Sequence, residues 1–65
     1  MVGDKWRRYS SEIVAKKIDQ YCELYTLTGI YMGLPGDYLC QDNEGNQWIE
    51  KKETFEARYC QLPTT

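Results

Sequence analysis

The sequence predicts a small all-β (mainly β) domain, an SH3-like roll or open barrel of about six short strands with one short helical turn near residues 52–56. The first observation is a turn in which Pro35 presets φ, Gly36 accepts the positive φ of a type II turn, and Asp37 caps the turn. The second is Gly45, which suits the left-handed position of a type I turn plus bulge between two apolar segments. The third is a composition that is 42% hydrophobic and 14% aromatic, which indicates a real core.

The domain organisation expected from 65 residues is a single domain whose core is small for its surface. Residues 1–8 are interpreted as an N-terminal arm, residues 9–62 as the β-rich domain and residues 63–65 as a frayed tail. Because so short a chain removes only about 60% of its surface from water on folding, we expect self-association to supplement the core.

Residues 11–25 carry two competing patterns. Val14, Ile18, Tyr21 and Tyr25 recur at helical spacing, which predicts an α+β fold with an N-terminal helix at 11–25 as the alternative. The same letters also alternate as strands would, and the Tyr and Thr residues in the second half favour strand. The pattern by itself leaves both possibilities open.

Two hairpins and a closing strand are expected in the rest of the chain. Thr28-Gly29 is interpreted as the tight turn between strands at 21–27 and 30–34. A second hairpin joins 38–41 to 47–51 through the loop at 42–46. Residues 52–56 are too few for a stable isolated helix and predict a single turn, after which residues 57–62 form a closing strand before Pro63.

A spaced set of residues resembles the small PGDYG-type domain of bacteria and their phages over residues 9–62. The set comprises Ala15-Lys16-Lys17-Ile18, Leu27-Thr28-Gly29, Pro35-Gly36-Asp37-Tyr38-Leu39, Gly45-Asn46-Gln47-Trp48, Lys51, Phe55-Glu56 and Tyr59. The resemblance implies that residues 13–18 form a strand, so it favours the all-β fold over the helical alternative. One departure is that the family has Pro on both sides of its Lys, whereas this chain has Ile49-Glu50-Lys51-Lys52-Glu53. The resemblance implies a fold and no activity.

Catalytic and metal chemistry is not expected. The chain has no His, so the usual general base near neutral pH is missing, and the protein is interpreted as not an enzyme. Cys22, Cys40 and Cys60 are odd in number and widely spaced, which predicts small core or strand residues rather than disulfides or a metal site. No cofactor is implied. The reduced cysteines and the lack of a signal-peptide or membrane-spanning run predict a cytoplasmic protein, in a bacterial host if phage-encoded.

The charge pattern argues against nucleic acid as the main partner. The net charge is −2 with both signs interspersed, so duplex nucleic-acid binding is not expected. One basic and aromatic cluster, consisting of Lys5, Trp6, Arg7, Arg8 and Tyr9, is interpreted as part of the N-terminal arm. Single-stranded nucleic acid therefore ranks third among the candidate ligands.

Surplus aromatic residues favour a binding role. Six Tyr are more than so small a core needs, and clustered exposed Tyr, Trp and Arg are typical of interfaces. The first hypothesis is therefore a non-catalytic module that acts by protein contact and forms homo-oligomers. The second is a small-molecule or nucleotide binder, including a phage-borne inhibitor that sequesters a host signal. The candidate binding residues are Asp37, Tyr38, Trp48, Lys51 and Arg58.

Overall fold

A computed structural model describes residues 3–63 of the chain, which form seven strands and one helix. In chain order these are β1 (Asp4–Arg8), β2 (Ser11–Lys17), β3 (Cys22–Thr26), β4 (Gly29–Gly33), β5 (Tyr38–Gln41), β6 (Gln47–Glu50), α1 (Lys52–Arg58) and β7 (Cys60–Gln61). The predicted all-β domain is confirmed, with one short helix.

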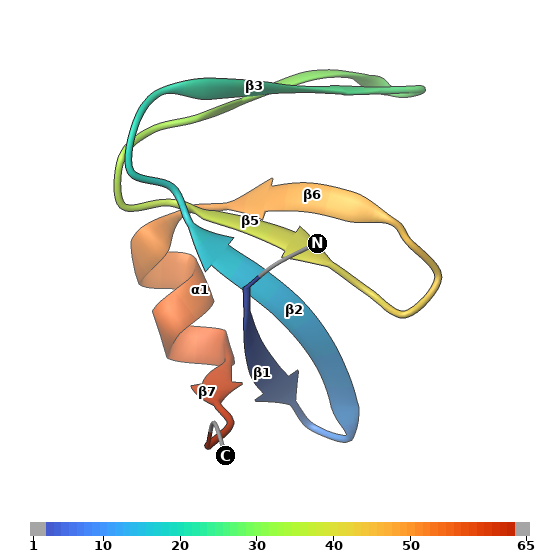
Figure 1. The fold of residues 1–65 in the computed structure, drawn as a ribbon, viewed down its shortest axis with the longest axis vertical. Coiled ribbons are helices and arrows are strands. Elements are labelled where there is room, and N and C mark those ends of the chain that lie inside the picture. Colours follow the sequence, from blue (N-terminus) through green and yellow to red (C-terminus); the bar gives the residue numbers. More distant parts are fainter. Residues whose placement is uncertain (1–2, 64–65) are drawn as a thin grey trace.

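The strands form two separate sheets (Figure 1). Five strands pair antiparallel in the order β6-β5-β2-β1-β7, so β6 and β7 are the edges of an open sheet. The other two, β3 and β4, pair only with each other among the described strands and form a hairpin that projects over β5 and β6. Helix α1 lies on the other side of the larger sheet from this hairpin.

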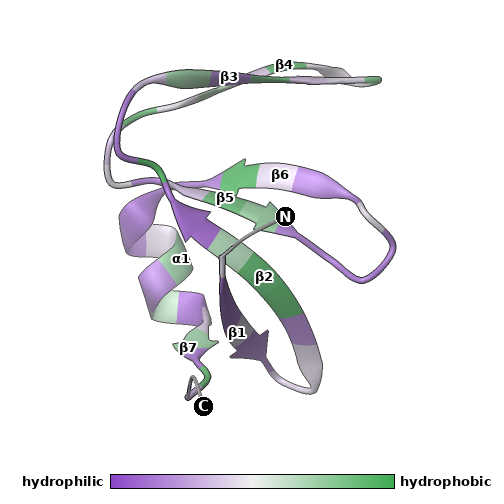
Figure 2. Cartoon of the chain, viewed as in Figure 1, coloured by the Kyte–Doolittle hydropathy of each residue, from purple (hydrophilic) through white to green (hydrophobic). Residues whose placement is uncertain are grey.

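The core lies between the larger sheet and α1, around the fully buried ring of Phe55. Its buried members are Ile13, Ala15, Tyr38, Cys40 and Phe55, with Trp6, Trp48 and Tyr59 packed against them. The Phe55 ring stacks on Tyr38 with 4.1 Å between ring centroids and on Tyr59 with 4.7 Å, and Trp6 meets it edge to face. Figure 2 shows hydrophobic stretches on the strands around this core and also on the hairpin that stands away from it.

Residues 11–25 form strands β2 and β3, so the alternative helix at 11–25 is wrong. Ile13 and Ala15 alternate into the core, with Ile13 opposite Trp6 of β1 and Ala15 opposite Cys40 of β5. β2 is therefore the central strand of the sheet, where tertiary pairing on both edges decides between two patterns that are locally equivalent. A helix over the same residues would leave β1 and β5 each unpaired on one edge and would divide the five-stranded sheet in two.

The predicted turns at Gly36 and Gly45 are confirmed. Gly36 has φ 98°, and Asp37 N–H donates to the Leu34 carbonyl over 2.9 Å, as a type II turn requires. Gly45 has φ 87° and its N–H donates to the Asp42 carbonyl over 3.2 Å. The first hairpin also exists, but its two turn residues are Leu27 and Thr28, and Gly29 begins β4.

The helix is longer, and the closing strand shorter, than the sequence predicts. Helix α1 covers seven residues, including Ala57 and Arg58, which were expected in the strand at 57–62. The strand that remains is β7, which has only two residues. Burial of Phe55 and its stacking on Tyr59 stabilise a second turn that the helical propensity of this segment alone does not predict.

The N-terminal segment belongs to the domain. Residues 4–8, interpreted from the sequence as an arm, form β1, which pairs with β2 and β7. Trp6 packs against the core, and Lys5, Arg7 and Arg8 lie beside it on the same paired strand. Residues 1–2 and 64–65, parts of the expected arm and tail, lie outside the described residues. Within residues 3–63, the one helix is too short to cross a membrane.

Candidate functional site

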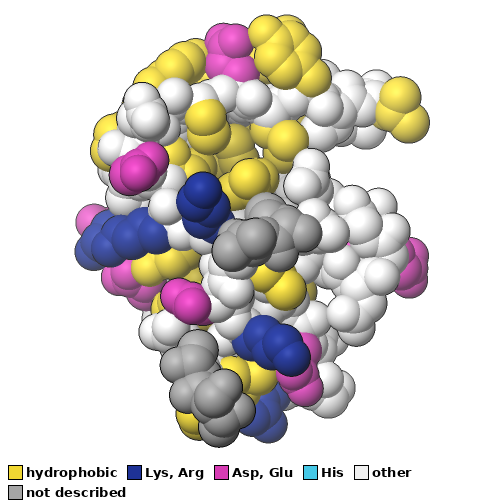
Figure 3. Space-filling model, in the orientation of Figure 1, with side chains coloured by type: hydrophobic (Ala, Val, Ile, Leu, Met, Phe, Trp, Pro, Cys, Tyr) yellow, Lys and Arg dark blue, Asp and Glu magenta, His cyan; other side chains and the backbone are white. Residues whose placement is uncertain are grey.

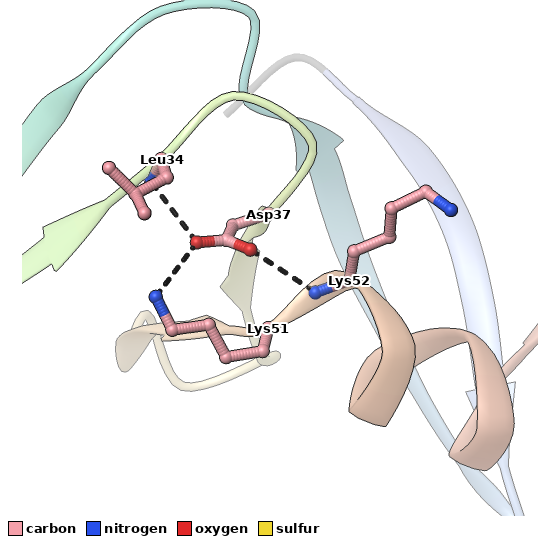
Figure 4. A network of polar contacts seen from close by, with 4 residues as sticks. All are labelled: Leu34, Asp37, Lys51 and Lys52. Carbon is pink, nitrogen blue, oxygen red and sulfur yellow. Dashed lines mark hydrogen bonds and ion pairs between the residues drawn. The ribbon is translucent and has the colours of Figure 1, made fainter.

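Asp37 is the most strongly engaged of the predicted binding residues. Its side chain is buried, and its carboxylate accepts three hydrogen bonds (Figure 4). Oδ2 accepts from Leu34 N–H over 3.0 Å and from Lys51 Nζ over 3.1 Å, while Oδ1 accepts from Lys52 N–H over 3.2 Å. The sequence predicts that Asp37 caps its own turn, and the bond from Leu34 confirms this.

The bond to Lys52 N–H gives Asp37 a second structural role. Lys52 is the first residue of α1, and a helix start leaves N–H groups without partners inside the helix. Burial by itself raises the pKa of Asp37, but the bonds from Leu34, Lys51 and Lys52 outweigh this, so the pKa is lowered from 3.8. The carboxylate therefore ties the Pro35-Gly36 turn to the start of the helix.

Among the other predicted residues, Lys51 pairs with Asp37, but Tyr38, Trp48 and Arg58 do not join them in a common site. Tyr38 is buried in the core, with its hydroxyl donating to Glu56 over 2.7 Å. Trp48 lies opposite Cys40 rather than Tyr38, and its indole N–H donates to Glu50. Tyr38 faces the helix and stacks on Phe55. Arg58 is exposed in the last turn of α1, at the opposite end of the helix from Lys51.

The three cysteines differ in how accessible their thiols are, and the one in the core is the least reactive. All three are free, and they differ in exposure: Cys40 is buried, Cys22 is half-buried and Cys60 is exposed. Burial, with a smaller contribution from Glu50, raises the pKa of the Cys40 thiol from 9.0 to about 12. Among residues 3–63 no group of three or more potential metal-ligating side chains comes together.

We expect Cys40 and Cys60 to react with thiol reagents at very different rates. At neutral pH a pKa of about 12 leaves roughly a thousandth of the thiolate that an unshifted thiol has, and burial also blocks access. Cys60 should therefore react rapidly in the native protein, whereas Cys40 should react only after unfolding. Mass spectrometry of the alkylated protein, with and without denaturant, measures both rates. Equal native rates at Cys40 and Cys60 would contradict the buried position of Cys40.

The largest uncovered apolar surface lies on the β3–β4 hairpin and its flanks. Eight large hydrophobic residues are exposed among residues 3–63, and all but Tyr9 fall between residues 21 and 34. Figure 3 shows hydrophobic side chains gathered over this hairpin. Five of the seven share its outward side by strand alternation, and we call them the outer face: Tyr21, Tyr25, Ile30, Met32 and Leu34.

Glu23 is the one charged side chain in the described hairpin, and it is held by its neighbours. Its Oε2 accepts from the Tyr21 hydroxyl and its Oε1 from the Tyr25 hydroxyl, each over 2.9 Å. The bond to Glu23 is also the main reason that the pKa of both tyrosines is raised. With both carboxylate oxygens occupied, the outer face presents rings and aliphatic groups with a partly masked charge.

The inner side of the hairpin borders an open cleft of about 460 Å³. One wall is the hairpin and the other is the loop and strand at residues 45–48, and Figure 3 shows the notch between them. The base of the hairpin meets the larger sheet at Gly33, where a Cβ would lie 2.5 Å from Ile18 Cδ1 and 3.2 Å from Ile49 Cδ1. The cleft lining contains no charged residue: Leu24, Tyr25, Thr26, Leu27, Thr28, Tyr31, Gly45, Asn46, Gln47 and Trp48.

Sequence reasoning identified part of this surface. It predicts that several tyrosines are exposed together, and Tyr21, Tyr25 and Tyr31 confirm this, whereas Tyr38 and Tyr59 are in the core. It does not single out Leu27, Ile30, Met32 or Leu34. The signal that could have found them was the absence of any charged residue from 24 to 36, together with the unbroken apolar run Ile30-Tyr31-Met32.

Comparison with protein-family models, curated proteins and solved structures finds no significant match. The resemblance to PGDYG-type domains therefore stays a prediction, and the function has to be argued from the hairpin and the cleft.

Proposed function

We propose that this protein is a non-catalytic interaction module that self-associates through the outer face of the β3–β4 hairpin. The observation that carries the proposal is the exposure of Tyr25 (70%), Ile30 (59%) and Met32 (61%) side by side on paired strands. The two tyrosines of the outer face, Tyr21 and Tyr25, alone present roughly 250 Å², at roughly 150–250 Å² per fully exposed ring, and Ile30, Met32 and Leu34 extend the same patch. Soluble monomers rarely expose contiguous apolar patches larger than a few hundred Å², and larger patches mark interfaces.

The stability of the hairpin supports the same proposal. A two-stranded sheet is marginal in water unless a further strand or a packed layer covers it. Here the hairpin rests on the larger sheet at its base, near Gly33, while its outer face is uncovered among the described residues. A second copy supplies the missing layer and also enlarges the small core of a 65-residue chain.

The nucleotide-binding alternative has less support. Base stacking and phosphate recognition need an aromatic ring and a cation in one pocket. Lys51 is paired with Asp37, and Arg58 lies at the far end of α1. The cleft that contains Trp48 and Tyr31 is lined by uncharged residues, so nothing there would meet a phosphate.

The test is the concentration dependence of mass in sedimentation equilibrium, using Ile30→Lys as the variant. We expect the wild-type protein to be a dimer or larger at micromolar concentration. Ile30→Lys should weaken association about tenfold or more, because a lysine would be buried without a partner. A wild-type protein that stays monomeric overturns the proposal.

Tyr9→Lys is the matched control. Tyr9 is 86% exposed and lies in the β1–β2 turn, so the same lysine is introduced outside the hairpin. It should associate as the wild type does. Equal weakening by the two variants would show that added charge, rather than the outer face, governs association.

A further inference from the structure

The cleft and the hairpin turn both lack charged side chains. Residues 24–36 contain no charged side chain, and neither does the opposite wall at residues 45–48. A charged segment entering this space would lose its hydration without gaining a partner, whereas a neutral apolar segment would lose little. The chain itself carries such a segment at the mouth of the cleft.

That segment is the hairpin turn, with Leu27 at its end. Leu27 is fully exposed, at 107%, so its side chain makes almost no contact within the described chain. Its neighbours hold it in position: Thr26 Oγ1 donates to the Gly29 carbonyl over 2.9 Å and accepts from Thr28 N–H over 3.2 Å. The Thr28 hydroxyl is also 3.0 Å from that of Tyr31, which ties the turn to β4. A preorganised leucine loses little conformational entropy on binding.

Building on the proposed self-association, we infer how two copies meet: each inserts Leu27 into the cleft between the hairpin and β6 of the other. Each copy has both a turn and a cleft. In a dimer with two-fold symmetry, the turn of each copy therefore enters the cleft of the other, so both contacts form together. The cleft has a volume of about 460 Å³, which leaves room for the leucine side chain together with residues beside it in the turn. Tyr25 and Ile30 flank the turn and would enter the same interface.

Two single variants test the two halves of this contact. Leu27→Lys places a charge on the turn, and Gln47→Glu places the opposite charge on the cleft wall. Both positions are exposed, so the fold should be unaffected, which far-ultraviolet circular dichroism checks. Each variant alone should weaken homodimerisation by about tenfold or more, because the new charge is buried without a counterion.

Mixing the two variants gives the decisive result. In a heterodimer, one insertion brings the lysine introduced by Leu27→Lys against the glutamate introduced by Gln47→Glu, and the other insertion is that of the wild type. Native mass spectrometry of an equimolar mixture should therefore show the heterodimer in clear excess over both homodimers. Tyr9→Lys mixed with Gln47→Glu is the control and should show no such excess, because Tyr9 lies outside the hairpin.

The outcomes separate this inference from the proposed function. If Ile30→Lys weakens the dimer but Leu27→Lys does not, the outer face mediates association and the insertion of Leu27 is refuted. If both single variants weaken the dimer but their mixture shows no excess of heterodimer, Leu27 does not meet Gln47 and the insertion is likewise refuted. If the wild-type protein is monomeric, both proposals fail together.

Discussion

Replacement of Phe55 by alanine should unfold much of the protein at room temperature. The Phe55 ring is fully buried and packs against Trp6, Tyr38 and Tyr59, whose ring centroids lie 4.1 to 4.7 Å from its own. Truncation of a buried Phe to Ala costs about 3–5 kcal/mol, since it removes apolar contacts and leaves a cavity. A domain of this length has a total unfolding free energy of only about 3–10 kcal/mol.

The measurement is thermal unfolding followed by circular dichroism. In a domain of this size each kcal/mol lowers Tm by about 4–8 °C, so Phe55→Ala should lower it by about 15 °C or more. Phe55→Leu, which keeps most of the volume, should have a much smaller effect. Thr54→Ala changes the neighbouring exposed residue in the same helix and should leave Tm nearly unchanged. A Phe55→Ala protein that melts close to the wild type would mean that α1 does not cover the core.

The sequence predicted the turns well because turn chemistry is local. Pro35, Gly36 and Gly45 restrict or extend the φ available at their own positions, so nothing far along the chain is needed to recognise them. Both hairpins follow from these and from Thr28-Gly29. The error of one residue at the first turn is small, because Gly29 still supplies a positive φ, at the first position of β4.

The choice between helix and strand at residues 11–25 is not local. Val14 and Ile18 suit one face of a helix, and Ile13 and Ala15 suit one face of a strand, in the same segment. Pairing of β2 with β1 and β5 decides it, and pairing depends on residues distant in sequence. The length of α1 was underestimated for the same reason, since Phe55 gains its stability from the sheet it packs on.

In the candidate site, too, the features set by neighbouring residues were predictable and those set by distant residues were not. The cap at Asp37 was predictable from its turn, but its bond to Lys52 joins residues fifteen apart and depends on the corner between β6 and α1. The sequence shows that residues 24–36 are uncharged without showing whether a neighbouring layer covers them. Leu27 and Ile30 are exposed because the fold places the hairpin on the side of the sheet away from α1, whereas α1 covers the core residues on the other side.

Replacement of Asp37 by alanine should destabilise the protein by about 2–3 kcal/mol. The substitution leaves the N–H groups of Leu34 and Lys52 without their acceptor at a partly buried corner, and unsatisfied buried groups cost about 1–3 kcal/mol each. Lys51→Ala is the matched control, because it removes the other partner of the ion pair. The Lys51 side chain is 63% exposed, so its loss should cost less than about 1 kcal/mol. Chemical denaturation of both variants compares the two costs, and equal losses would mean that the ion pair, rather than the backbone bonds, holds the corner.

The pH dependence of stability tests whether the ionised carboxylate of Asp37 is what stabilises this corner. Burial opposes ionisation of Asp37, but its hydrogen bonds outweigh that effect, so its pKa in the folded protein is below 3.8. The folded state therefore binds fewer protons than the unfolded state in acid, and the stabilisation by Asp37 is complete above about pH 4 and disappears as the pH falls through the folded pKa. Asp37→Asn cannot ionise, so its deficit relative to the wild type should be largest near neutral pH and should shrink in acid. Asp42 and Glu56, whose pKa values are also lowered by hydrogen bonds, are present in both proteins and cancel from the difference. A deficit that is constant from neutral pH into acid would show that the shape of the side chain matters at this corner and its charge does not.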